Sequence, residues 1–342
     1  MAVFGGKREF LAGGLYVTRL ISLLGQMPAR DSLLVLNYHR IGDPRNDLFD
    51  PGVFSATADQ FSEQVSYLKR HVSLVTLEEA LAFVDGTLNE RTPRCRVLLS
   101  FDDGYRDNYQ VAFPILRSYG ASGVFFLATG LVGSSCVPWW DHIAFLLNTA
   151  RQRRFTLRYP VDLDVDVVKN GLTPTIREVL RLYKRLGNLD SGRFIEELTS
   201  AARGDDLPRC ARRFLNWDEA REMLAADMAI GSHTHSHAVL TQLDPEQQRY
   251  DLSQSRLLLK QHLSIEADVL AYPVGAQSSI SNQIQRSARE VGYRAAFSSY
   301  GGTNLPGATH PYNIKRVGVG WQSARCFRVR SGICRITGRY WP

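Results

Sequence analysis

Residues 96–104 read RVLLSFDDG, a largely apolar run that ends in two aspartates and a glycine. Because the run is apolar along nearly its whole length, rather than at every second position, it predicts a strand buried on both faces. Such strands are typical of parallel sheets covered by helices. Asp102 and Asp103 would then lie at the carboxyl end of the strand, where the loops of α/β folds carry functional groups.

Six further runs of the same kind lie elsewhere in the chain, separated by segments with apolar residues at helical spacing. The strand-like runs are LLVLN (33–37), GVFFLA (123–128), MAIGS (228–232), DVLAYP (268–273), RAAFS (294–298) and IKRVGV (314–319), and the helical patterns cover 58–70, 108–119, 245–263 and 281–291. We therefore predict an α/β fold, a distorted (β/α) barrel of about seven parallel strands spanning residues 31–320. Residues 139–216 break the alternation, and we expect a helical insertion there that caps one end of the barrel.

The composition is that of a folded globular protein, with 44% hydrophobic and 22% charged residues among 342, which excludes a disordered or fibrous chain. The net charge of +7 is concentrated at the C-terminus, because no acidic residue follows Glu290. Residues 321–342 form a predicted basic tail that interleaves arginines with aromatic residues. Such a mixture favours an anionic surface, either lipid headgroups or a phosphate-bearing ligand, and a solvated tail is the alternative. No motif for nucleic-acid binding is present, so we expect no nucleic-acid partner.

Residues 1–30 carry a basic, amphipathic pattern that predicts an N-terminal helix too short and too interrupted to span a bilayer. This helix could lie on a membrane or pack on the main domain. Five widely spaced cysteines without a CxxC pair favour a reducing compartment. Together with the absence of a signal-peptide pattern, these features lead us to expect a cytoplasmic protein, peripheral on the inner membrane.

Two clusters of polar residues directly after predicted strands suggest a metal site. Two adjacent carboxylates, Asp102 and Asp103, are costly to bury unless they meet a cation, and a helix cap would explain only one of them. In SHTHSH (232–237) a helical turn would place His233 and His237 on one face, whereas an extended strand would align all three histidines, including His235. Two imidazoles and one carboxylate with open positions form a typical hydrolytic metal site.

Weaker candidates for site residues lie directly after two other predicted strands and at the start of the insertion. His39 ends the first predicted strand, and AYPVG (271–275) ends another, where Tyr272, Pro273 and backbone N–H groups could line a substrate. Trp140, with its neighbour Trp139, could stack on a sugar ring, and burial beneath the insertion is the alternative for both.

The ordered motifs LNYHRIGD (36–43), LLSFDDGYRDNY (98–109), IGSHTHSHAVL (230–240) and AYPVG (271–275) resemble the NodB-type polysaccharide deacetylases, carbohydrate esterase family four. The resemblance implies a distorted (β/α) barrel and metal-dependent removal of N-acetyl groups from sugars. It implies that Asp103, His233 and His237 hold a divalent metal, most often Zn²⁺, with Co²⁺ as an alternative. It further implies that Asp102 is the general base and that the Val274 N–H helps to stabilise the oxyanion.

Two departures from the family pattern bear on the site. An arginine that orients the catalytic aspartate in the fuller pattern is replaced by Ala271, and Arg316 is our candidate to supply that charge from another strand. The family's general-acid histidine has no clear counterpart; His310 is near in sequence, and His39 is better placed, so we expect His39 in the pocket.

The expected function is hydrolysis of an N-acetyl group on an amino sugar, in a cell-surface polysaccharide or in its lipid- or nucleotide-linked precursor. The expected partner is thus an N-acetylated glycan or a lipid-linked sugar, with peripheral contact to an anionic membrane. Two alternatives remain: an amidohydrolase-type metallohydrolase that uses His233 and His235 as an HxH pair, and an inactive glycan-binding protein, suggested by Ala271.

Overall fold

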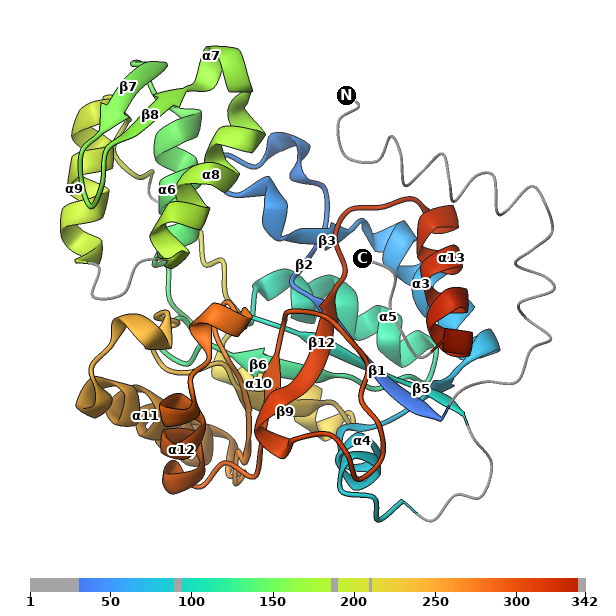
Figure 1. Ribbon diagram of the computed structural model, residues 1–342. Helices are drawn as coiled ribbons and strands as arrows, with labels where there is room; N and C mark the ends of the chain where they lie inside the picture. Colours follow the sequence, from blue (N-terminus) through green and yellow to red (C-terminus); the bar gives the residue numbers. More distant parts are fainter. Residues whose placement is uncertain (1–30, 89–93, 186–189, 209–210, 338–342) are drawn as a thin grey trace.

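The computed structural model describes residues 31–88, 94–185, 190–208 and 211–337, and its centre is a closed barrel of seven parallel strands (Figure 1). The strands follow one another around the barrel in the order β1-β12-β11-β10-β9-β6-β5, and β5 pairs with β1 from Ser32↔Cys95 to Tyr38↔Phe101 to close it. The predicted fold class is therefore confirmed. The barrel strands are β1 (Ser32–Tyr38), β5 (Cys95–Phe101), β6 (Val124–Leu127), β9 (Ala229–Ser232), β10 (Val269–Ala271), β11 (Ala295–Ser298) and β12 (Ile314–Gly318).

Helices surround the barrel, and several begin at side-chain caps that the sequence supplies. Thr57 and Gln60 form a capping box at the start of α3, and Asp244 caps α11; such caps satisfy N–H groups that the first helical turn leaves unpaired. The segment 108–118 departs from the expected single α-helix because its first turn is a π-helix. The helices outside the insertion are α3 (Ala58–His71), α4 (Leu77–Val84), η3 (Asn108–Ala112), α5 (Phe113–Ser118), α10 (Trp217–Ala225), α11 (Pro245–Leu263), α12 (Asn282–Val291) and α13 (Ala324–Thr337).

Shorter elements complete the barrel domain. A parallel pair of two short strands follows β1, and a further short strand lies beside the start of β5. These strands are β2 (Arg40–Ile41), β3 (Phe54–Ala56) and β4 (Ser73–Leu74), and the short 3₁₀ helices are η1 (Pro44–Asn46), η2 (Pro51–Val53), η4 (Leu240–Gln242), η5 (Gln277–Ser279) and η6 (Pro311–Asn313).

The strands bury both faces, as their composition predicts, and the two faces belong to different clusters. On β1, Leu33 and Val35 pack in one cluster with residues of α4, whereas Leu34 and Leu36 pack in another with residues of α3. Because side chains alternate along a strand, each apolar run packs some side chains in the barrel interior and the others against the covering helices. This doubly buried barrel fixes the strand ends that carry the polar residues.

The insertion forms a group of elements with its own apolar core, seen in Figure 1 beyond one end of the barrel. The insertion was expected to be helical, but it also contains an antiparallel hairpin between α6 and α7. The elements are α6 (Trp139–Asn148), β7 (Arg154–Leu157), β8 (Leu163–Asp166), α7 (Val167–Asn170), α8 (Leu172–Arg185) and α9 (Ser191–Ala202).

The C-terminal segment is not a solvated tail over residues 324–337, because it forms helix α13 against α3. Phe327 is 1% exposed and meets the ring of Tyr67 edge-on at 6.4 Å, and Cys334 is fully buried. The predicted amphipathic helix of residues 1–30 lies outside the described residues. Among the described helices, none combines the length and the apolar character that crossing a bilayer requires.

Candidate active site

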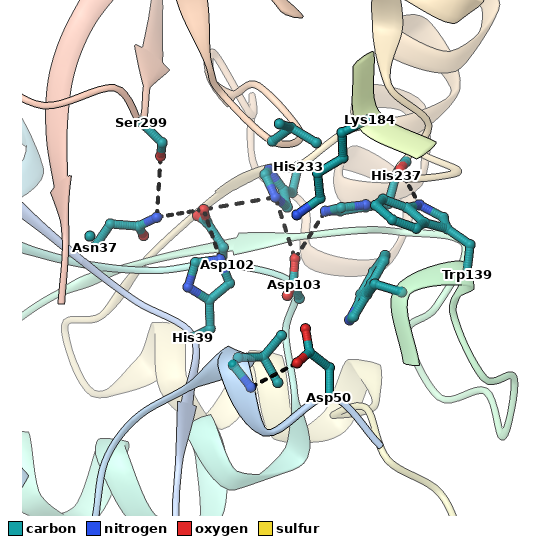
Figure 2. Close-up of a pocket in the computed structure, with 15 residues that line it drawn as sticks. Asn37, His39, Asp50, Asp102, Asp103, Trp139, Lys184, His233, His237 and Ser299 are labelled. Atoms are coloured by element: carbon teal, nitrogen blue, oxygen red, sulfur yellow. Dashed lines mark hydrogen bonds and ion pairs between the residues drawn. The ribbon is translucent and has the colours of Figure 1, made fainter. Parts of the chain in front are cut away.

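The carboxyl ends of the barrel strands open into a cavity of about 300 Å³ (Figure 2). Three parts of the chain line it: the strand ends, the segment around η2, and helices α6 and α8 of the insertion. The lining residues are Asn37, His39, Asp50, Gly52, Val53, Asp102, Asp103, Trp139, Trp140, Lys184, His233, His237, Val274, Ser299 and Gly318.

Asp103, His233 and His237 converge in this cavity, and all three are buried. Asp103 Oδ1 lies 3.4 Å from His233 Nε2 and 3.1 Å from His237 Nε2, and one donor atom from each residue falls within 4.8 Å of the others. His235 lies apart, with its Nδ1 3.1 Å from the Thr129 hydroxyl. The grouping thus follows the i, i+4 spacing and gives no support to an HxH pair.

The donor atoms of this triad suit a divalent metal. His233 Nδ1 is 2.8 Å from the Ala271 carbonyl oxygen, which accepts its proton, and Nε2 is therefore the ring nitrogen that faces Asp103. Asp103 Oδ1 is buried, yet no described group donates a well-directed hydrogen bond to it. A buried oxygen without a donor, beside two imidazole nitrogens, is the arrangement that Zn²⁺ and similar ions complete.

Burial raises the pKa of Asp103, but the imidazoles of His233 and His237 outweigh burial and hold that pKa well below its usual range. Burial lowers the pKa of His237 below its ordinary value. His237 is therefore neutral near pH 7, the form that can act as a metal ligand.

Asp102 is held by a bidentate contact with Arg316, which is fully buried. The Arg316 guanidinium donates to the two carboxylate oxygens at 2.7 and 2.8 Å, and Asn37 Nδ2 donates to one of them at 2.9 Å. Burial alone would raise the pKa of Asp102, but Arg316 lowers it to about 2. Asp102 is therefore an ionised carboxylate next to the triad.

Two positions proposed after β10 differ from expectation, because Tyr272 and Pro273 are not among the residues that line the cavity. Tyr272 is 1% exposed, packs with residues of α11 and α12, and donates its hydroxyl to the Tyr312 carbonyl oxygen at 3.1 Å. The cause is strand alternation: Ala271 belongs to the cluster of the barrel interior, so the next side chain turns outward.

His39, Val274 and Trp140 do line the cavity. His39 Nε2 is 3.9 Å from Asp102 Oδ2, and the His39 side chain is 34% exposed. Trp140 is 4% exposed, so it offers little surface to a sugar. Its indole N–H donates to the Tyr105 hydroxyl at 2.7 Å and its ring lies 4.2 Å from that of His237, which makes it a support for the triad.

Several lining residues were missed by sequence reasoning. Asn37 and Ser299 follow or end predicted strands, so the strand-end rule could have found them. Asp50 and Lys184 come from segments outside the strand ends, and no local pattern marks them. His310, the other histidine considered, is exposed and is not among the lining residues.

Comparison with known proteins places this chain in a family. Residues 89–296 match the family model described as polysaccharide deacetylase. The chain belongs to the polysaccharide deacetylase family. This family member is 32% identical over 116 residues to the poly-beta-1,6-N-acetyl-D-glucosamine N-deacetylase of Staphylococcus epidermidis, an alignment that covers 31% of the chain and 39% of that relative. The same-named Staphylococcus aureus protein (strain N315) is 31% identical over 113 residues, 30% of the chain and 38% of that relative. The chain thus matches about two-fifths of the length of these curated relatives.

Solved structures agree in fold. The Streptococcus pyogenes deacetylase PplD, solved in complex with acetate, superposes with a TM-score of 0.57 at 17% identity, covering 92% of this chain and all of that one. IcaB from Ammonifex degensii gives a TM-score of 0.56 at 20% identity, covering 89% and 97%. At these identities the likeness shows the barrel fold alone.

Ala271 is the position where we expect this polysaccharide deacetylase family member to depart from the fuller family pattern. The Ala271 carbonyl oxygen holds His233, while Arg316 reaches Asp102 from β12 on the other side of β11. An arginine is thus present at the aspartate, but it comes from a different strand.

Proposed function

We propose that this chain is a metal-dependent hydrolase that removes N-acetyl groups from an amino sugar in a cell-surface polysaccharide or its lipid- or nucleotide-linked precursor. One observation carries the proposal: the ionised carboxylate of Asp102 stands directly beside a buried Asp103–His233–His237 triad at the mouth of the barrel. A general base beside a metal site with three protein ligands is the smallest set of groups that hydrolysis of an unactivated amide requires. Family membership and the names of the staphylococcal relatives support the choice of an N-acetylated glycan.

The triad would hold the metal, with Zn²⁺ the first choice for one carboxylate and two imidazole ligands, and Co²⁺ the alternative. When bound, a divalent ion supplies Lewis acidity at the acetyl carbonyl and lowers the pKa of water in the site.

The chain's own residues supply the proton transfers and the positioning. Asp102 accepts the proton of the attacking water, and its low pKa keeps it in the accepting form at neutral pH. The Val274 N–H, which no other described residue uses, donates to the oxygen that becomes negative. We assign return of a proton to the leaving amine to His39, which lines the cavity near Asp102 and is not part of the triad.

The test is acetate release from a panel of N-acetylated sugars, including short glucosamine oligomers and lipid-linked precursors, after metal removal and reloading with Zn²⁺ or Co²⁺. Asp102→Asn should keep the metal stoichiometry and lose turnover by at least about 100-fold, because the carboxylate acts only in proton transfer. His233→Ala should lose both metal and turnover. Full activity of Asp102→Asn with metal bound would rule out the assigned base.

We also propose that the protein is cytoplasmic and that α13 contributes to contact with an anionic membrane. Arg325 is exposed on this helix, and Arg328 and Arg330 are partly exposed. Because Phe327 and Val329 between them are buried, truncation would damage the fold. Charge reversal at Arg325 and Arg328 is the better perturbation, read by co-sedimentation with vesicles containing phosphatidylserine and by cell fractionation. Unchanged binding to these vesicles would refute the membrane contact.

A further inference from the structure

Lys184 and Asp50 bring opposite charges into the cavity from outside the barrel strands (Figure 2). Lys184 lies in the last turn of α8 in the insertion, and Asp50 is the N-cap of η2. Both face the space in front of the triad, and the proposed chemistry assigns a task to neither.

The two side chains line the same cavity and do not pair with each other. Burial raises the pKa of Asp50 while the Lys184 ammonium opposes that rise, and burial lowers the pKa of Lys184 while Asp50 opposes it, so each charge senses the other. Yet no ion pair or hydrogen bond joins them. Asp50 Oδ1 accepts the Gly52 N–H at 2.8 Å, whereas Oδ2 has no partner among the described residues. The Lys184 Nζ lies 5.7 Å from the centre of the Trp139 ring, and its charge is also attracted by the Asp103 carboxylate.

The gap between an ammonium and a carboxylate suits one kind of group. An anion would satisfy Lys184 and be repelled by Asp50, and a cation would have the reverse problem. A hydroxyl accepts from the ammonium with its oxygen and donates its proton to the carboxylate, so it satisfies both. We propose that Lys184 and Asp50 form a clamp for one neutral hydroxyl of the substrate sugar and so select against a charged substituent at that position.

The clamp is held in place before any ligand binds. A Cβ at Gly52 would lie 2.9 Å from Asp50 Oδ1, so glycine is what allows this carboxylate orientation. The Asp50 N–H donates to Asp141 Oδ1 of α6 at 3.2 Å. At the other side, Gln242 Nε2 donates to the Tyr183 carbonyl oxygen at 2.7 Å and fixes the end of α8. A preorganised pair loses little entropy when it captures a hydroxyl.

The clamp rests on the proposed function, because that function makes an N-acetylated sugar the substrate. Its test uses monodeoxy analogues of the N-acetylated oligosaccharide with the highest kcat/KM. For the wild-type holoenzyme, one analogue should lower kcat/KM by at least roughly 10-fold, the loss of one charge-assisted hydrogen bond. Lys184→Met and Asp50→Asn should each lower kcat/KM for the parent sugar by a similar factor. In each variant, kcat/KM for that same analogue should be close to kcat/KM for the parent sugar. Lys169→Met and Asp162→Asn, exposed positions of the insertion, serve as matched controls.

Metal content and thermal unfolding of each variant exclude loss of the fold as the cause. The clamp is overturned if Lys184→Met and Asp50→Asn keep wild-type kcat/KM, or if they discriminate against every monodeoxy analogue as the wild type does. If the wild type releases no acetate, the proposed function fails, and titration calorimetry with the same sugars still tests the clamp: equal affinity of wild type and Lys184→Met would overturn it.

Discussion

Replacing Arg316 by leucine should convert Asp102 from a paired carboxylate to a buried carboxyl group without a cation. The pKa of Asp102 is about 2 in the folded protein, against an ordinary value of 3.8. At about 1.4 kcal/mol for each tenfold change in proton affinity, that difference corresponds to about 2–3 kcal/mol of stability at neutral pH. Removing one partner of a buried ion pair commonly lowers stability by about 3–5 kcal/mol, which sets the expected loss in Arg316→Leu.

The pH dependence has a definite sign. Because folding lowers the pKa of Asp102, its contribution is complete above about pH 4 and is lost as the pH falls toward 2. The difference in unfolding free energy between wild type and Arg316→Leu should therefore shrink between pH 5 and pH 2.5. Urea denaturation at both pH values, followed by circular dichroism, measures it.

A double-mutant cycle with Asp102→Asn isolates the pair from the rest of the site. The two single variants and the double variant should show a coupling energy of about 2 kcal/mol or more at pH 7, since the residues share two hydrogen bonds. Coupling below about 0.5 kcal/mol, or a stability difference that is constant with pH, would refute the claim that Arg316 holds Asp102 ionised.

Three other perturbations test neighbouring features. Gly275→Ala should destabilise the protein by about 1–3 kcal/mol, because Gly275 has φ +60° and an added Cβ would lie 2.8 Å from the backbone nitrogen of Ser299. Thermal unfolding measures this loss, and an unchanged Tm would contradict the geometry. Phe327→Ala should lower the urea-unfolding free energy by about 3–5 kcal/mol, since its ring is 1% exposed, and a loss below about 1 kcal/mol would mean that α13 does not pack as described. Burial raises the pKa of Asp141 to about 6, so its ionisation opposes folding at neutral pH. The contribution of Asp141 to the unfolding free energy should therefore increase as the pH falls from 6 toward 4. Asp141→Asn should lack this increase.

The fold was predictable because each barrel strand is an apolar run bounded by turn residues. All seven predicted runs overlap the observed strands, within one or two residues at most ends. The triad of Asp103, His233 and His237 follows two of these strands, so the topology alone brings it together. Whether these residues bind metal and catalyse stays a prediction that the experiments above test.

Other parts of the site depend on tertiary packing that no local pattern encodes. Lys184 enters the cavity because the last turn of α8 docks on the barrel, and nothing in its own sequence marks that contact. Tyr272 was assigned to the substrate because it follows a strand, although alternation from Ala271 turns it outward. The sequence of the basic C-terminal segment predicts a tail because its arginines obscure the buried stripe of Phe327 and Cys334.

The hydrophobic core of the insertion also includes Tyr105, from the segment after β5, and its helices α6 and α8 supply one wall of the cavity. The triad and Asp102 stand instead on strand ends of the barrel. Residues that shape the entrance and residues positioned to react thus belong to different structural elements, which meet where Trp140 contacts Tyr105 and His237. Mutations in the insertion away from Trp140 and Asp141 could accumulate during evolution without disturbing the barrel. Related chains could then diverge in the sugars they admit while inheriting the same reactive centre.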